Sequence, residues 1–337
     1  MRTNNPPRIS IVLPARDAAP TLPACLRSIA RQTERSWECI IVDDGSIDET
    51  ARIARLFADH DPRFRVVTTP PCGLIAALNE GLRHCRAPLV ARMDADDLMH
   101  RRRLRVQAEA LDHDAMLSAV GSRVRLFPRR SLSPRLREYE EWLNGLQSAA
   151  DVRRDAFIEC PVAHPTLMMR RDIAADGYVD RGWPEDYDLV LRALSRGHRI
   201  AVVPERLTAW RNGPNSLSRR DLRYAQDRFT ACKAHFLSIG FLAAHATYVL
   251  WGYGGTGRTL RRALAAHGRV PSHIVEVKRS RIGQRIHGAE VVPDTAITTL
   301  RGRRIVVSVA RAGPRSIIRT ALARAGFVEG EDFVCAA

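Results

Sequence analysis

The sequence predicts an α/β protein in which a parallel sheet carries helices on both faces, followed by a second, smaller α/β unit. Through the first half, short apolar runs alternate with amphipathic segments, which is the order of consecutive β-α-β units. Two of the apolar runs end in clustered carboxylates, Asp43-Asp44 and Asp94-Ala95-Asp96-Asp97. Parallel strands present their carboxyl ends at one edge of a sheet, where open α/β folds bind ligands. The two clusters therefore predict one shared site.

The elements expected in the first half alternate regularly along the chain. Strands are predicted at 9–13, 39–42, 65–68 and 89–93, and helices at 21–32, 48–58, 74–84 and 100–113. A polar helical stretch follows over 129–155, and then a mixed region to residue 218. These assignments predict a first domain over 1–220, a helical linker over 221–245 and a second domain over 246–337.

The second domain is expected to begin with a strand at 248–251 and a glycine-rich turn. A helix to residue 266, strands at 273–277 and 304–309 and a helix at 314–325 complete a small βα series. Gly252, Gly254 and Gly257 have the spacing of a dinucleotide-binding turn, and Glu276 is placed to accept a hydrogen bond from a ribose hydroxyl. About 90 residues are too few for a full dinucleotide domain with its own substrate site. The domain is thus predicted to be a Rossmann-like module with one of three roles: binding of NAD(P) or another nucleotide, regulation of the first domain, or dimerisation. The alternative is a relic of such a domain with an empty pocket.

Composition narrows the class of protein. The net charge of +16 is almost wholly arginine, with Lys233 and Lys278 as the only lysines, and from Trp251 onward there are 15 basic and 6 acidic residues. This excess predicts contact with an anionic membrane surface, the alternative being a solvated arginine-rich face. Nucleic acid is not a predicted partner, because no helix-turn-helix or zinc motif is present and only 6% of residues are aromatic. Seven scattered cysteines, the absence of an apolar leader and the interrupted apolar stretch 239–251 predict a cytoplasmic protein. It is expected to be either soluble or peripheral at the inner face of the membrane.

The acidic clusters point to a specific chemistry. Crowded carboxylates repel one another, so a fold that retains them usually holds a hard cation or a proton between them. Residues two apart at a strand end point the same way, so Asp94 and Asp96 are expected to face one ion. The first cluster also has a structural alternative, since Asp44 followed by glycine suits a turn, and Ser46 with Glu49 suits a capping box.

Three motifs occur in a characteristic order: Val42-Asp43-Asp44-Gly45-Ser46, Arg92-Met93-Asp94-Ala95-Asp96-Asp97 and Trp183-Pro184-Glu185-Asp186-Tyr187-Asp188-Leu189. Minor matches fall between and after them, at Arg103 to Gln107, His164-Pro165-Thr166 and Trp210-Arg211. Together these motifs resemble the family 2 glycosyltransferases of the GT-A fold over residues 8–220. Any single motif is a weak signal, but the ordered set is specific.

The resemblance implies a GT-A type, mixed and mainly parallel sheet, and a Mg²⁺ or Mn²⁺ ion that neutralises the diphosphate leaving group. Asp96 is the implied metal ligand, Asp94 contacts the ribose or the waters of the metal, and Asp186 takes the proton of the acceptor hydroxyl. Asp43 and Asp44 match the positions that hold uracil and ribose. The full set implied for the nucleotide-sugar site is Pro14, Asp43, Asp44, Arg92, Asp94, His164, Glu185 and Arg211.

Structural interpretations stand beside several of these roles. Glu185 and Asp186 also suit the first turn of a helix, where acidic side chains are favourable. Arg92 and Arg211 are suited to clamping diphosphate oxygens or, alternatively, to pairing with nearby carboxylates. His164 is expected near the donor or acceptor, the alternative being a packed or capping histidine.

The predicted function is an inverting, metal-dependent glycosyltransferase, specifically a hexosyl- or N-acetylhexosaminyl-transferase. It moves a sugar from a nucleotide-sugar donor, with a UDP-sugar favoured, to a glycan or lipid-linked acceptor in bacterial surface polysaccharide synthesis. The alternative is an NAD-dependent oxidoreductase or a sugar-nucleotide-modifying enzyme centred on the C-terminal domain. That alternative predicts NAD binding and no role for Asp96.

Overall fold

The computed structural model describes residues 6–213 and 216–337, which form two compact units. The first unit runs to Val152 and adds Val162–Arg181 and Arg196–Ser216; the second consists of Arg153–Pro161, Gly182–Ser195 and Leu217–Ala337. The sequence places residues 153–161 and 182–195 in the first domain, whereas their contacts place them in the second unit. One reason is that Phe157 and Ile158 pack against the apolar cores of the C-terminal domain.

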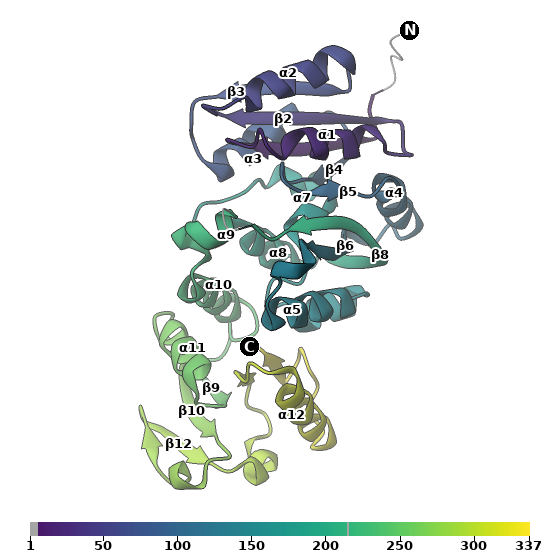
Figure 1. Cartoon of the computed structure of the whole chain (residues 1–337). Helices are drawn as coiled ribbons and strands as arrows, with labels where there is room; N and C mark the ends of the chain where they lie inside the picture. The colour runs from purple at the N-terminus through teal and green to yellow at the C-terminus, as the bar shows by residue number, and fades with distance from the viewer. Residues whose placement is uncertain (1–5, 214–215) are drawn as a thin grey trace. The chain divides into compact units, whose positions relative to one another are not determined.

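An eight-stranded sheet forms the centre of the first unit, in the order β3-β2-β1-β4-β7-β6-β8-β5 (Figure 1). The first four strands in this order run parallel, and β7 is antiparallel to both β4 and β6. The strands are β1 (Ile9–Ala15), β2 (Trp37–Asp44), β3 (Phe64–Thr69), β4 (Leu89–Arg92), β5 (Leu98–Met99), β6 (Leu117–Phe127), β7 (Met168–Arg170) and β8 (Arg199–Arg211). The predicted mixed, mainly parallel sheet is confirmed.

Alternate side chains of β1 face two different layers of helices. Ile11 and its neighbours on one face pack in a core with α1 (Leu22–Ala30) and α2 (Thr50–His60). On the opposite face lies α3 (Leu74–His84), and a Cβ added to Gly81 of this helix would lie 2.6 Å from Val12 Cγ1. Only glycine allows this close approach of helix and strand.

Two local predictions differ from the structure. Helix α4 (Arg103–His113) begins three residues later than expected, because the chain first turns so that the N–H of Arg103 donates to the His100 carbonyl. The predicted capping box is wrong: Ser46 Oγ accepts from the N–H of Asp17, and the side chain that accepts from the first N–H of α2 is that of Asp48, at 2.9 Å. The Asx turn at Asp48 thus takes the place of the expected cap.

A six-stranded sheet in the second unit has the order β11-β12-β10-β9-β13-β14. All pairs are parallel except β11 with β12, so the central β9 is flanked by β10 and β13 as in a Rossmann-like half. Helices α11 (Gly255–Ala265) and α12 (Ala312–Arg324) accompany it. The strands are β9 (Thr247–Trp251), β10 (Val270–Val275), β11 (Arg285–Ile286), β12 (Ala289–Val292), β13 (Ile305–Val307) and β14 (Phe333–Cys335).

The second unit also contains α8 (Glu185–Ser195) and the 153–161 segment, which contact each other and the C-terminal domain. Instead of one long linker helix, the chain forms the short turn η3 (Leu222–Tyr224) and α10 (Gln226–Ile239). The Tyr187 hydroxyl on α8 donates to the Ala156 carbonyl at 2.7 Å. Asp155 in turn pairs with Arg319 of α12 at 2.6 Å. No helix in the described parts of the chain is both long and apolar enough to cross a bilayer.

Candidate active site

Three neighbouring strands of the first unit end at one edge of the sheet and carry predicted site residues. In the parallel register, Ala15 at the end of β1 lies opposite Asp43 of β2, and Val12 lies opposite Arg92 at the end of β4. Pro14 lies one residue inside β1 rather than after it. The structure therefore places both acidic clusters at the same edge of one sheet.

The carboxylates of β2 are buried and accept hydrogen bonds from adjacent loops. Asp44 Oδ1 accepts from the N–H of Cys72 at 2.7 Å, and its Oδ2 accepts from the N–H of Gly73 at 3.0 Å. Asp43 Oδ1 accepts from the N–H of Ser46 at 3.3 Å. These bonds fix the directions of both carboxylates at the sheet edge.

Residues 94–97 form a tight turn directly after β4. Arg92 Nη2 donates to Asp94 Oδ1 at 2.6 Å, so Arg92 pairs with a neighbouring carboxylate, the alternative expected for it. Burial and then the Asp94 charge raise the pKa of Asp96 to about 6. No side chain in the described ranges pairs with the Asp96 carboxylate, which leaves its oxygens available to a ligand.

Asp97 holds Arg211 against this turn. Its buried Oδ1 accepts from the backbone N–H of Arg211 at 2.6 Å, while Arg211 Nε donates to the Asp96 carbonyl at 2.7 Å. The guanidinium lies 4.5 Å from the centre of the Phe127 ring. Burial, with the charges of Asp94 and Asp96, raises the pKa of Asp97 well above its usual range. Arg211 thus lies beside the acidic turn, and its contact with a diphosphate stays a prediction.

A buried cation supports the turn from within the fold. Arg103 Nη2 donates to the Arg92 carbonyl at 2.9 Å, and Arg103 Nε donates to Gln107 Oε1 at 2.9 Å. Burial lowers the pKa of Arg103 to about 9. Gln107 Nε2 donates to the carbonyls of Val120 and Thr166 at 3.1 and 2.8 Å. In the sequence these two residues form only a minor motif match. The signal for their role is that an arginine and a glutamine lie one helical turn apart on the buried face of α4.

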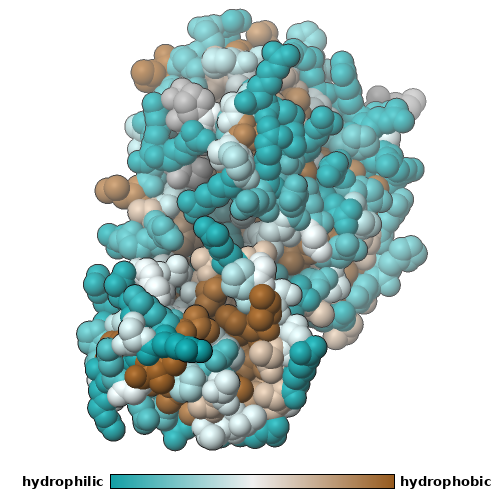
Figure 2. All heavy atoms as spheres, turned by 60° about the horizontal axis from the view of Figure 1, so that its bottom comes forward, coloured by the Kyte–Doolittle hydropathy of each residue, from teal (hydrophilic) through white to brown (hydrophobic). Residues whose placement is uncertain are grey.

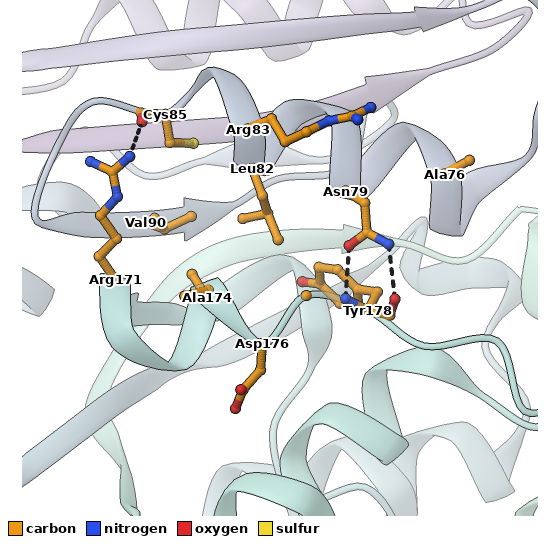
Figure 3. Close-up of a pocket in the computed structure, with 12 residues that line it drawn as sticks. Ala76, Asn79, Leu82, Arg83, Cys85, Val90, Arg171, Ala174, Asp176 and Tyr178 are labelled. Atoms are coloured by element: carbon orange, nitrogen blue, oxygen red, sulfur yellow. Dashed lines mark hydrogen bonds between the residues drawn. The ribbon is translucent and has the colours of Figure 1, made fainter.

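His164 is buried and bonded to a tyrosine that the sequence analysis did not single out. Its Nε2 lies 2.8 Å from the Tyr178 hydroxyl, and burial together with Arg92 holds the pKa of His164 well below its usual range. Tyr178 also lines a pocket of about 550 Å³ between α3 and α7 (Arg171–Ala175), where Figure 3 shows the Asn79 amide bonded to its backbone. The Tyr178 hydroxyl thus holds the His164 ring, and Asn79 of α3 in turn holds the backbone of Tyr178.

Glu185 and Asp186 open α8, in the second unit. Glu185 is entirely buried, and its two carboxylate oxygens lie 2.7 and 2.8 Å from the Tyr224 hydroxyl. Asp186 is half-buried, and its Oδ1 accepts from the N–H of Tyr187 at 2.7 Å. Burial, then the charges of Glu185 and Glu159, raise the pKa of Asp186 to about 8. In its ionised form a carboxylate with this pKa is a stronger base than an ordinary carboxylate.

The acidic turn suits a divalent cation that is bound together with a substrate. Within residues 6–213 and 216–337, no three histidine, cysteine, aspartate or glutamate side chains converge on one point. Mg²⁺ at phosphate sites typically uses one or two carboxylates and completes its ligands with waters and substrate phosphates. Asp96 fits this use, because its charge is crowded by Asp94 and no side chain neutralises it directly.

Comparisons with known proteins agree with this geometry. The sequence profile of Glycosyl transferase family 2 matches residues 10–177. Over 243 residues the chain is 30% identical to the putative glycosyltransferase EpsE of Bacillus subtilis (strain 168), covering 68% of this chain and 84% of that protein. The chain belongs to glycosyl transferase family 2. The resemblance expected from the ordered motifs is confirmed.

The transferase is similar to further relatives and solved structures. It is 31% identical over 203 residues to the amylovoran biosynthesis glycosyltransferase AmsE of Erwinia amylovora, covering 59% of this chain and 73% of that protein. S. aureus TarS 1-349 in complex with UDP-GlcNAc matches with a TM-score of 0.56 at 16% identity, over 77% of this chain and 72% of that one. The mannosyltransferase PcManGT of Pyrobaculum calidifontis, in complex with GDP-Man and Mn2+, matches with a TM-score of 0.51 at 20% identity, over 79% and 70%. The fold of the transferase is of the GT-A type, as predicted.

The C-terminal glycine turn of the transferase lies between β9 and α11. Gly252 has a φ of 95°, and a Cβ on Gly257 would lie 2.2 Å from the Gly252 carbonyl oxygen, so glycine is required for this close packing. Gly254 precedes the first residue of α11. Glu276 follows β10 and pairs with Arg281 at 3.1 Å. The family match ends at residue 177 and does not reach this turn, so nucleotide binding here stays a prediction.

Proposed function

We propose that the transferase catalyses the metal-dependent, inverting transfer of a sugar from a nucleotide sugar, favouring a UDP-sugar, to a glycan or lipid-linked acceptor in bacterial surface polysaccharide synthesis. The observation that carries this proposal is the acidic turn 94–97 at the carboxyl edge of the sheet. There a crowded Asp96 carboxylate without a paired side chain lies beside the fixed Arg211. The name of the relative AmsE, which refers to amylovoran biosynthesis, supports the polysaccharide context.

We propose that residues of the first unit bind the nucleotide-sugar donor. Asp96 would hold the divalent cation, which when bound stabilises the negative charge of the leaving diphosphate. Asp43 and Asp44 are proposed to contact the uracil and ribose, and Asp94 the ribose or the waters of the metal. Around them Pro14, Arg92, His164 and Arg211 are proposed as further contacts to the nucleotide sugar. Glu185, which is entirely buried against Tyr224, is proposed to act beside Asp186 instead.

The acceptor side requires a base, for which we propose Asp186. The acceptor oxygen forms a bond to the anomeric carbon while the bond from that carbon to the diphosphate oxygen breaks, which inverts the configuration. The acceptor proton passes to the Asp186 carboxylate, and the nucleoside diphosphate leaves with the electron pair of the broken bond. The raised pKa of Asp186 supports this role, because a more basic carboxylate takes the proton with a smaller penalty.

A nucleotide titration tests the proposed donor. We expect calorimetry to show UDP binding that requires Mn²⁺, because the cation screens the diphosphate from the acidic turn. GDP and NAD⁺ serve as comparison ligands, since PcManGT was solved with GDP-Man and the C-terminal turn predicts NAD(P). Binding of GDP in place of UDP would contradict the UDP proposal, and binding of NAD⁺ alone would favour the oxidoreductase alternative.

The basic C-terminal domain is proposed to contact an anionic membrane, from which a lipid-linked acceptor could be reached. Large apolar side chains are exposed there, including Val277 and Ile317 at 69% and 71%. Figure 2, in which the bottom of Figure 1 comes forward, shows apolar side chains gathered on a mostly hydrophilic surface. Flotation with phosphatidylglycerol vesicles should recover the protein at about 0.1 M salt and lose it at about 0.5 M, since added salt screens surface charge. Phosphatidylcholine vesicles are the control; equal recovery with both lipids, or with neither, contradicts the proposal.

A further inference from the structure

A tyrosine hydroxyl contacts the acidic pair at the start of α8. Tyr224 is the last residue of η3, and its Oη lies 2.7 and 2.8 Å from the two carboxylate oxygens of Glu185. A phenol has one proton to donate, so the two short distances describe a donor shared between both oxygens. Because Glu185 is entirely buried, this hydrogen bond stabilises the ionised form of a carboxylate that burial would otherwise penalise.

Charged groups from several segments surround the pair. Those that face it or its neighbours are Glu159 of the 153–161 segment, Arg223 of η3, Lys233 of α10, and Asp188 with Arg192 on α8. Arg223 is occupied by Asp221, to which its Nη2 donates at 2.5 Å. Lys233 Nζ donates to the Ile158 carbonyl at 2.6 Å. Arg223 and Glu185 also attract each other, and Tyr224 adds a hydrogen bond to the carboxylate oxygens of Glu185.

We propose that Tyr224 is a positioning residue for the transfer: its hydroxyl holds the ionised Glu185 carboxylate beside Asp186, and the charge of Glu185 strengthens Asp186 as a proton acceptor. This inference rests on the proposed function, because it concerns the base of that reaction. Tyr224 needs no contact with either substrate for this role. Its proposed effect on the reaction passes through Glu185.

Removal of the hydroxyl in Tyr224→Phe has a defined consequence. Glu185 loses a donor and takes a proton more readily, so its charge no longer opposes ionisation of Asp186. Asp186 then ionises at lower pH and becomes a weaker base. We expect kcat to fall about 10-fold and the acid limb of the pH profile to move down by about one pH unit, with KM for the donor within about twofold.

The test measures UDP or GDP release from UDP-GlcNAc or GDP-mannose with Mn²⁺, water serving as acceptor, over about pH 6 to 9.5. Wild type is compared with Tyr224→Phe, Glu185→Gln and the double variant. Glu185→Gln should move the acid limb in the same direction, and Tyr224→Phe should add nothing in its presence, because both remove one charge effect. Tyr248→Phe is the matched control, since this buried tyrosine of the same unit has a hydroxyl without a partner among the described residues.

Each outcome separates this inference from the proposed function. A Tyr224→Phe profile that coincides with wild type, or additive effects in the double variant, overturns the role of Tyr224 while leaving the transferase proposal intact. A wild type that releases neither nucleotide from either donor contradicts the proposed function instead. If Tyr224→Phe fails to fold, an acid limb unmoved in Glu185→Gln overturns the inference.

Discussion

Asp186→Asn should lower sugar transfer by about three orders of magnitude, since general-base catalysis typically contributes about 10² to 10⁴. The asparagine amide cannot accept the acceptor proton, while the backbone of α8 is retained. In the wild type the active form is the ionised carboxylate, so activity should rise with pH through about 8, where burial and the charges of Glu185 and Glu159 have placed the pKa of Asp186. The measurement is kcat against pH, by nucleotide release. A variant with wild-type kcat, or a wild-type profile flat between pH 6 and 9, would rule out Asp186 as the base.

The same substitution should stabilise the protein at alkaline pH. The folded pKa of Asp186, about 8, lies above its usual value of 3.8, so its contribution to stability is fully present below pH 3.8 and is lost as pH rises through 8. Asparagine does not titrate, so the gain should grow over this range to about 1–2 kcal/mol at pH 8, reduced from the full pKa difference by solvent contact. Melting temperatures at pH 5, 6.5 and 8 measure it. The control Asp188→Asn should lose stability instead, because Asp188 pairs with Arg192 and accepts from Trp183 Nε1.

Asp96→Asn should abolish the part of UDP affinity that depends on Mn²⁺. Loss of the Asp96 carboxylate, with which no described side chain pairs, removes the ligand proposed for the cation, and we expect UDP binding to weaken about 100-fold with Mn²⁺ present. Without Mn²⁺ the variant should bind UDP no more weakly than wild type, because a repulsive charge beside the diphosphate has also been removed. Calorimetric titration in both conditions measures this difference.

The matched control for Asp96 is Asp112→Asn, which removes one exposed carboxylate of the same unit, paired with Arg8. In this variant UDP binding should depend on Mn²⁺ to the same extent as in the wild type. Wild-type Mn²⁺ dependence in Asp96→Asn would assign the cation to other ligands, and equal weakening with and without Mn²⁺ would indicate a general loss of the site rather than of its metal.

Local patterns were sufficient to predict the sheet edge and its acidic residues. The apolar runs before Asp43 and Asp94 are buried parallel strands, and such runs are continuous in sequence, so the edge they share follows from topology alone. The capping box failed for a local reason, since Ser46 and Asp48 found partners in the loop after β1.

Contacts between distant segments could not be predicted. Arg211 reaches the acidic turn through Asp97 and a two-residue strand, β5, which is too short to leave a pattern in the sequence. Tyr178 and Tyr224 are single tyrosines whose partners lie 14 and 39 residues away. The sequence pattern of α8 also gives no sign that this helix belongs to a different unit from its neighbours in the chain. Its contacts nevertheless assign it to the second unit.

Helix α8 is encoded between two parts of the first unit but packs with the C-terminal domain, and this limits how the gene can be rearranged. A recombination after residue 216 would exchange Tyr224 and Arg319 while leaving Glu185 and Asp155 behind. Asp155 is 3% exposed and pairs with both Arg154 and Arg319, so the exchange would remove one of the cations that neutralise this buried carboxylate. We therefore expect viable chimaeras to take residues 153–161 and 182–195, with the helix that carries the proposed base, from the same parent as the C-terminal domain.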